Sequence, residues 1–271
     1  MTDVLIPAAL FLIMAVLHFL RENEITVEPE AIFELGAASS LGSREVQQDY
    51  FGTKKVRSTL LMLMADGIGE NGDSAAKLAV DTFRDLFNDK SAKEKPQYFF
   101  QRAANAANKK IVNTLEERQG ESSMAAVIIK DAKFFYMLVG NSRIAVFRDG
   151  DLIPVSQGQT VDVLARHRYN EGKISKRETL ALLNEHRRYN VLGQDSFQEI
   201  EIFDKPLELQ RDDLVVLMSE GVFNTLQWNE IEMALEKNSS AKESAREIIS
   251  RVNRSPRVDK DNASILIYRQ E

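Results

Sequence analysis

An apolar segment that ends in an acidic residue constrains the fold of this chain more than any other feature. Residues 59–65 read Thr-Leu-Leu-Met-Leu-Met-Ala, and Asp66-Gly67 and a glycine-rich turn follow. A continuous apolar run of this length is typical of a strand that is buried on both faces. A carboxylate directly after such a strand lies at the rim of a core, where burial is costly unless the group is paired or binds a metal.

Two further acidic residues stand beside apolar runs. Glu220 closely follows the run 214–218, and Asp261 precedes the run 263–268. Acidic groups at three strand ends favour a site for a hard cation, because Mg²⁺ and Mn²⁺ prefer carboxylate, carbonyl and water ligands. The three histidines are too scattered in the sequence for a zinc motif, and the absence of cysteine excludes disulfides and thiolate sites. The net charge of −6 argues against nucleic acid as a partner.

The N-terminal segment predicts a membrane anchor within residues 1–22. Val4 to Leu20 contains no Asp, Glu, Lys or Arg, and as a helix it would be about 25 Å long, near the short end of a membrane span. A signal peptide would need a positive n-region and a small-residue cleavage site, and both are missing. A buried core helix is the other alternative. Arg21 follows the segment, so the positive-inside rule predicts a single-pass cell-membrane protein with its domain in the cytoplasm. Residues 23–30 are predicted to be a linker.

The apolar runs and turn signals predict a single α+β domain over residues 31–271. Strands are expected near residues 31–37, 47–52, 58–65, 123–130, 133–139, 143–148, 198–203, 213–219 and 263–269. Helices are expected over 74–87, 96–117, 229–236 and 241–253, with two short ones within 159–188. Hairpin turns are expected at 130–133 and 148–151. Strands first paired as a meander, with helices grouped between them, favour a layered α+β domain over a parallel sheet.

Six short motifs follow one another between residues 42 and 262. They are Gly42-Ser-Arg-Glu-Val-Gln-Gln-Asp49, Asp66-Gly-Ile-Gly-Glu70, Val139-Gly-Asn-Ser-Arg143, Gly172-Lys-Ile-Ser175 with His186–Gly193, Ser219-Glu-Gly221 and Asp261-Asn262. Together they resemble the motifs of the metal-dependent protein phosphatases, the type 2C Ser/Thr phosphatases, in their bacterial form. Each match is weak by itself, but six in the family's order are a strong signal.

The resemblance implies a four-layer αββα sandwich, in which two antiparallel sheets are flanked by helices, with a flap segment at about 155–195. The N-terminal transmembrane helix would be added to this domain. The resemblance also implies two Mn²⁺ or Mg²⁺ ions. Asp66 would bridge both ions, and the Gly67 carbonyl, Glu220 and Asp261 would complete the protein ligands. Such ions offset the charge of a phosphate monoester and activate water for in-line attack.

Two further residues match catalytic positions of the family. Arg44 matches the phosphate-binding arginine, whose guanidinium fork can take two phosphate oxygens. Asp49 matches an aspartate that holds water at the metals. Three more residues are expected to lie next to the ligands and to support them without binding the ions directly: Gln48, Asn141 and Asn262.

Three positions depart from the family's motifs. Gln48 stands where glutamate is usual, and the loss of one charge should weaken the second ion's site. Glu220 replaces an aspartate and adds one methylene, which can displace an ion that must be positioned closely for attack. Asn141 replaces the aspartate that the family uses for an additional, weaker metal, so a third site is expected to be lost or feeble.

These observations support two functions. The first is a membrane-anchored, metal-dependent phosphoprotein phosphatase that hydrolyses phosphoserine or phosphothreonine. Its partner would be a phosphorylated protein, with a membrane Ser/Thr kinase or that kinase's targets as candidates, and the membrane itself through residues 4–20. The alternative is a weak or inactive pseudophosphatase that binds a phosphoprotein or partner, which the three departures motivate. A structural membrane protein is a third class, but it leaves the ordered motifs unexplained.

Overall fold

Burial on both faces of the central strands organises this domain. The computed structural model describes residues 33–115, 120–195, 197, 199–203, 205–237 and 240–271, and the described elements all belong to one compact unit, Ile32–Glu271. In β3 (Thr59–Ile68), Leu61 and Leu63 face one hydrophobic cluster while Met62 and Met64 face another. Because side chains alternate between the two faces of a strand, a strand between two cores needs apolar residues at every position.

The strands of the described residues form two antiparallel sheets. The five-stranded sheet has the order β1 (Phe33–Ser40), β11 (Ala263–Gln270), β10 (Leu214–Met218), β6 (Arg143–Arg148) and β7 (Asp151–Pro154). The six-stranded sheet has the order β2 (Asp49–Val56), β3, β4 (Glu121–Lys130), β5 (Lys133–Val139) and β8 (Glu201–Ile202), and β9 (Leu207–Glu208) also pairs with β5.

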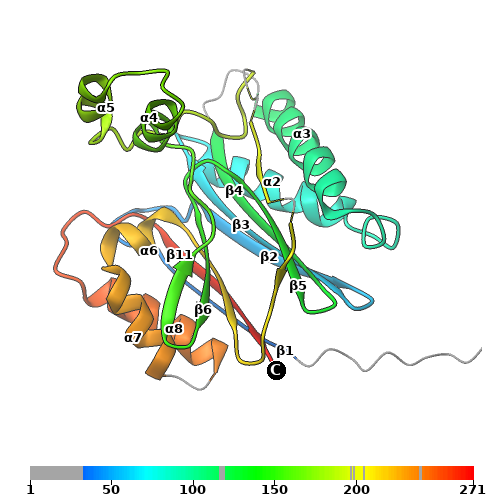
Figure 1. Cartoon of the computed structure of the whole chain (residues 1–271). Helices are drawn as coiled ribbons and strands as arrows, with labels where there is room; N and C mark the ends of the chain where they lie inside the picture. The colour runs from blue at the N-terminus through cyan, green and yellow to red at the C-terminus, as the bar shows by residue number, and fades with distance from the viewer. Residues whose placement is uncertain (1–32, 116–119, 196, 198, 204, 238–239) are drawn as a thin grey trace, which may run out of the picture. The chain divides into compact units, whose positions relative to one another are not determined.

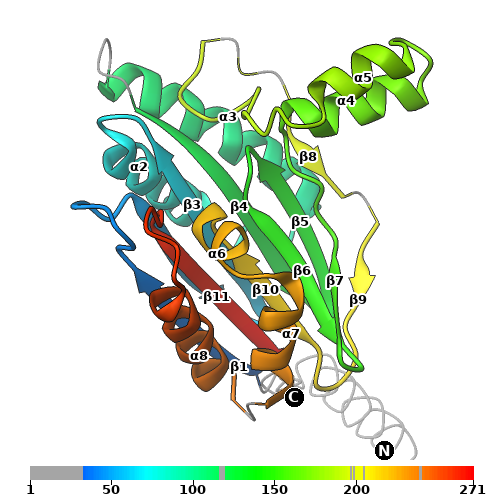
Figure 2. The same ribbon diagram turned by 90° about the vertical axis from the view of Figure 1, so that its left-hand side faces the viewer.

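Helices cover the outer faces of both sheets (Figures 1 and 2). α2 (Gly72–Leu86) and α3 (Pro96–Leu115) share a hydrophobic cluster with the six-stranded sheet. α6 (Glu220–Thr225), α7 (Trp228–Lys237) and α8 (Ala241–Arg254) share another with the five-stranded sheet. A third cluster lies between the sheets. The predicted α+β fold with two antiparallel sheets flanked by helices is therefore confirmed.

Most predicted elements are present, and the two predicted hairpins are confirmed. Lys130 pairs with Lys133, and Arg148 pairs with Asp151. The Asp149-Gly150 turn has positive φ at both residues, 53° and 91°, as a tight two-residue loop requires. The two short helices are α4 (Val161–Asn170) and α5 (Lys176–Leu182).

Three elements were not among the predicted ones: β7, β9 and α6. The first two are short, and α6 is only six residues long, too short for a periodic pattern. Within the ranges that the structure describes, no helix is long and apolar enough to cross a membrane. The predicted anchor at residues 4–20 and the linker at 23–30 lie outside the described residues.

Candidate functional site

Strand alternation brings polar side chains from both sheets to one end of the space between them. Met62 and Met64 point into the cluster between the sheets, so Asp66, two residues further along β3, points the same way. Asp49 is directly opposite Asp66 in the β2–β3 pair. Ser219, which follows β10, donates its hydroxyl hydrogen to Asp49 Oδ2 at 2.7 Å. The end of β10 in one sheet thus meets β2 and β3 in the other.

Glycines allow the acidic segments to pack closely. Gly67 follows Asp66, and a Cβ added there would lie 2.1 Å from the Gly72 carbonyl oxygen. Gly221 follows Glu220, and its added Cβ would lie 2.0 Å from the Asn262 carbonyl oxygen. Any side chain at either position would push the backbones apart, so the glycines in the Asp-Gly and Glu-Gly motifs have a steric reason.

The structure brings Asp66 and Glu220 to the same cation, the guanidinium of Arg188. Arg188 Nη2 donates to Asp66 Oδ2 at 3.3 Å and also pairs with Glu220 Oε2. The other oxygen of Glu220 accepts from Asn224 Nδ2 at 2.9 Å. Glu220 is the first residue of α6, where a carboxylate is favoured by the partial positive charge of a helix N-terminus.

The carboxyls at this site are electrostatically costly. Burial raises the pKa of Asp66 well above its ordinary value, and the charges of Asp49, Glu220 and Asp261 raise it further, while Arg188 opposes the rise. Burial likewise raises the pKa of Asp49 to about 6, although the hydrogen bond from Ser219 opposes this rise. Two buried carboxyls that resist ionisation in this way favour an added positive charge beside them.

Arg44 lies beside Asp261 at the solvent-accessible side of the site. Its Nε donates to Asp261 Oδ1 at 3.1 Å, and this hydrogen bond raises the pKa of the guanidinium. The Arg44 side chain is about half exposed. Both residues line a cavity of about 410 Å³ together with Asp259, Arg257 and Asn224. Arg44 is therefore positioned to meet an anion that approaches from solvent.

The three supporting residues have different surroundings. Asn262 is buried, and its side chain accepts from the Gln48 backbone N–H at 2.8 Å and donates to the Leu41 carbonyl at 2.9 Å. The Gln48 amide donates to the Gly69 carbonyl at 2.8 Å, so it stabilises the glycine-rich turn after Asp66. Asn141 instead accepts from Arg143 at 3.1 Å, in the β5–β6 turn.

Sequence reasoning missed two residues of this site, Ser219 and Arg188. Ser219 belongs to a quoted motif, and the alternation along β10 would have directed its side chain between the sheets. Arg188 lies in the segment that resembles the family's flap, but no periodicity or spacing indicates that its side chain reaches Asp66. Only the tertiary structure reveals that contact.

The carboxylate ligands at this site suit a hard divalent cation, and the Arg188 guanidinium lies between two of them. Asp66, Glu220 and Asp261 offer carboxylate oxygens, and burial and the neighbouring carboxylates raise the pKa of Asp66 even though Arg188 lies beside it. Among the residues that the structure describes, however, no group of three or more His, Asp or Glu side chains is arranged to hold a metal ion. The position between Asp66 and Glu220 is taken by Arg188.

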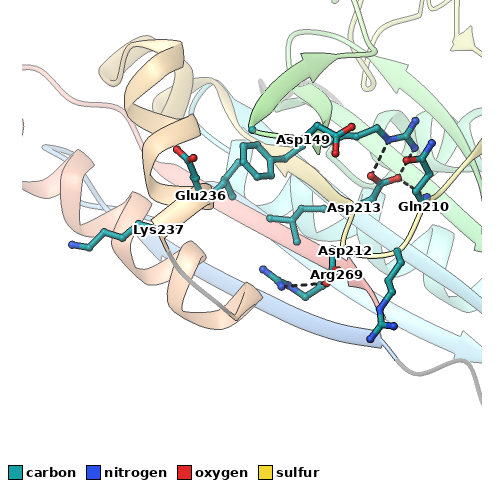
Figure 3. Close-up of a pocket in the computed structure, with 13 residues that line it drawn as sticks. Asp149, Gln210, Asp212, Asp213, Glu236, Lys237 and Arg269 are labelled. Atoms are coloured by element: carbon teal, nitrogen blue, oxygen red, sulfur yellow. Dashed lines mark hydrogen bonds and ion pairs between the residues drawn. The ribbon is translucent and has the colours of Figure 1, made fainter.

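A separate cavity of about 490 Å³ lies at the opposite end of the five-stranded sheet (Figure 3). Its lining includes Asp213, which is 2% exposed and accepts from Arg148 Nε at 2.9 Å. Asp213 also accepts from the backbone N–H of Gln210 at 2.6 Å. This ion pair joins the end of β6 to the start of β10, and we interpret it as structural.

Comparison with known proteins identifies the class to which this fold and site belong. The family model described as protein phosphatase 2C matches residues 38–260, which is most of the chain. The chain therefore belongs to the protein phosphatase 2C family. This confirms the predicted family and, at the level of the family, the predicted enzyme class of protein serine/threonine phosphatases.

Individual relatives agree with this assignment. The serine/threonine phosphatase stp of Listeria monocytogenes (strain F2365) is 25% identical over 224 residues, which cover 78% of this chain and 84% of the relative. A solved serine/threonine phosphatase of S. agalactiae has a TM-score of 0.76 at 19% identity and covers 89% of this chain and 100% of that one. The catalytic domain of the phosphatase PstP, solved in complex with two manganese ions, has a TM-score of 0.68 at 20% identity and covers 88% of this chain and 97% of that one.

Proposed function

We propose that this protein is a Mn²⁺- or Mg²⁺-dependent phosphatase that hydrolyses phosphoserine or phosphothreonine in proteins. The observation that carries the proposal is the convergence of Asp49, Asp66, Glu220 and Asp261 at one end of the space between the sheets. Family membership adds the class of reaction.

The residues would divide the work as follows. Asp66, the Gly67 carbonyl, Glu220 and Asp261 would hold the two cations, which when bound supply positive charge and activate water. Arg44 would bind the phosphate through its guanidinium fork, because it lines the adjoining cavity and its side chain is half exposed. Asp49 would accept a hydrogen bond from the attacking water and orient it, while the hydroxyl of Ser219 holds the carboxylate in place.

Steady-state hydrolysis of a phosphothreonine peptide, with Mn²⁺ and with a chelator, tests this function. We expect turnover that depends on Mn²⁺ and a loss of at least about a hundredfold in Asp66→Asn, since the substitution removes one of the charged residues that would hold the cations. Asp85→Asn, which changes an exposed aspartate of α2, serves as the control and should retain full activity. Absence of turnover in the folded wild-type protein at saturating Mn²⁺ would contradict the proposal.

The pseudophosphatase alternative gains no support from the comparisons, because the relatives are described as phosphatases. The substitutions that motivate it can still be tested. If Gln48 weakens the second ion, Gln48→Glu should tighten Mn²⁺ binding measured by calorimetry, since the added carboxylate increases the ligand charge. A large gain of activity from near zero in this variant would favour the alternative.

We also propose that residues 4–20 anchor the protein in the cell membrane, with the phosphatase domain in the cytoplasm. The support is the uncharged apolar segment and the arginine that follows it. A phosphorylated membrane protein, such as a membrane Ser/Thr kinase or one of its targets, would then be within reach. Carbonate extraction of membranes tests the anchor: Leu12→Arg should shift the full-length protein to the soluble fraction, because an arginine at a span's centre costs about 3 kcal/mol. Thr2→Arg, outside the apolar segment, should remain in the membrane pellet.

A further inference from the structure

Arg188 takes the position between two residues that would hold metal. Its Nη2 pairs with a carboxylate oxygen of Asp66 and with one of Glu220. Asp66 lies near the end of β3 in the six-stranded sheet, whereas Glu220 is the first residue of α6, which packs against the five-stranded sheet. A single guanidinium thus offsets part of the carboxylate charge on both sides of the site, a role that a divalent cation would fill more completely.

The backbone around Arg188 is held in place, so its side chain is directed at the site by the fold. Val161 N–H donates to the Arg187 carbonyl at 2.9 Å, and Tyr189 N–H donates to the Gln159 carbonyl at 3.1 Å. Arg188 itself forms an isolated antiparallel bridge with Thr160. Its side chain is only 22% exposed. These contacts tie the segment to the start of α4 on both sides of Arg188.

The contact leaves one polar group of Arg188 unsatisfied. Within the described residues, its Nε–H is buried and has no hydrogen-bond partner. A buried donor without a partner destabilises the folded state, and this cost is relieved when the donor is exposed to water. When the Arg188 side chain leaves the site, hydration of its Nε–H would therefore offset part of the cost of breaking its ion pairs.

We propose that Arg188 is a built-in competitor of the divalent cation, which must displace the guanidinium from Asp66 and Glu220 before it can bind. The inference rests on the proposed metal-dependent function and adds to it a residue that sets the metal affinity. In the absence of metal, Arg188 holds the two carboxylates together and stabilises the site. The protein would then bind metal more weakly than its carboxylates alone would allow.

Calorimetric titration of the full-length protein with Mn²⁺ tests the competition. If the guanidinium occupies the site in about nine molecules of ten, it lowers the apparent affinity about tenfold. Arg188→Gln removes the charge and should therefore bind Mn²⁺ about tenfold more tightly. Arg187→Gln, which changes the exposed neighbouring arginine, should bind like the wild type.

Thermal unfolding provides a second readout that does not depend on activity. In a chelator, Arg188→Gln should unfold at a lower temperature than the wild type, because the carboxylates lose their counter-charge. At saturating Mn²⁺ this difference should vanish or reverse. Should Arg188→Gln fail to fold, Arg188→Lys, which keeps the charge but lacks the fork, should fold and bind Mn²⁺ several-fold more tightly than the wild type.

The outcomes separate the inference from the proposed function. Equal Mn²⁺ affinities of the wild type and the folded Arg188 variants would overturn the competition and leave the phosphatase function standing. Weaker binding in Arg188→Gln would overturn it as well and would make Arg188 a supporting residue. Absence of Mn²⁺ binding in every variant would overturn both proposals.

Discussion

Replacing Asp49 with asparagine should stabilise the metal-free protein at neutral pH. Asp49 is 6% exposed, and burial raises its pKa from 3.8 to about 6. The folded protein therefore binds the Asp49 proton more tightly than the unfolded chain does, and this contribution to stability is lost as the pH rises through the folded-state pKa. The shift of about two units at about 1.4 kcal/mol per unit corresponds to about 3 kcal/mol. Asparagine removes this charge penalty and keeps an oxygen that can accept from Ser219.

Urea unfolding in the presence of a chelator measures this effect. At pH 7.5 we expect the free energy of unfolding of Asp49→Asn to exceed that of the wild type by up to about 3 kcal/mol. At pH 4.5 the wild-type carboxyl is largely protonated in the folded state, so the advantage should shrink by about 2 kcal/mol. Asp85→Asn serves as the control, because this aspartate is exposed on α2.

Two results would refute the reasoning. One is a stability difference between Asp49→Asn and wild type that does not change between the two pH values. The other is an Asp49→Asn protein that is less stable than wild type at pH 7.5, which would mean that the hydrogen bond from Ser219 outweighs the cost of burying the charge. A metal-loaded protein should behave in the opposite way, since bound cations favour the ionised carboxyl.

Three further predictions concern the glycine-rich turn, the structural ion pair and the phosphate-binding residue. Gly67→Ala should lower the free energy of unfolding by about 3 kcal/mol in urea titrations, because the new Cβ would overlap the Gly72 carbonyl, and an unchanged value would contradict the close approach. Asp213→Asn should lower the melting temperature and reduce the free energy of unfolding by about 2 kcal/mol, since it weakens the ion pair with the partly exposed Arg148. Recovery of the lost stability when Arg148→Met is added to the same chain would confirm that the two residues are coupled. Arg44→Lys should lower kcat/KM for a phosphopeptide by about tenfold, because lysine lacks the guanidinium fork, whereas equal values would exclude Arg44 from phosphate binding.

Much of the layered fold could be predicted because burial leaves a local record in the sequence. The run in β3 is apolar at every position since both of its faces are covered, by α2 on one side and the second sheet on the other. The turns at 130–133 and 148–151 contain aspartate and glycine, which tolerate positive φ, and Asp131, Asp149 and Gly150 all adopt it. Elements as short as β7 and α6 carry no such pattern, and neither was predicted; α6 begins directly after the predicted strand 213–219.

The candidate site was predictable to a different extent from residue to residue. The order of the motifs indicated Asp49, Asp66, Glu220 and Asp261, and the structure places these residues near one another, although their roles stay predictions. The acidic residues stand out because carboxylates at the ends of buried strands are costly and therefore unusual. Sequence spacing could not show that the strand ends converge, since that depends on how the two sheets stack.

The sequence by itself determined which residues have to be buried, which turns can form and which family's motifs the chain carries, because these properties depend on composition and order over short stretches. The tertiary structure alone decided that Ser219 hydrogen-bonds Asp49 and that Arg188 lies between Asp66 and Glu220. Arg188 is 122 residues from Asp66 and 32 from Glu220 along the chain. Contacts of this kind arise only when distant segments fold together, so no local pattern can report them.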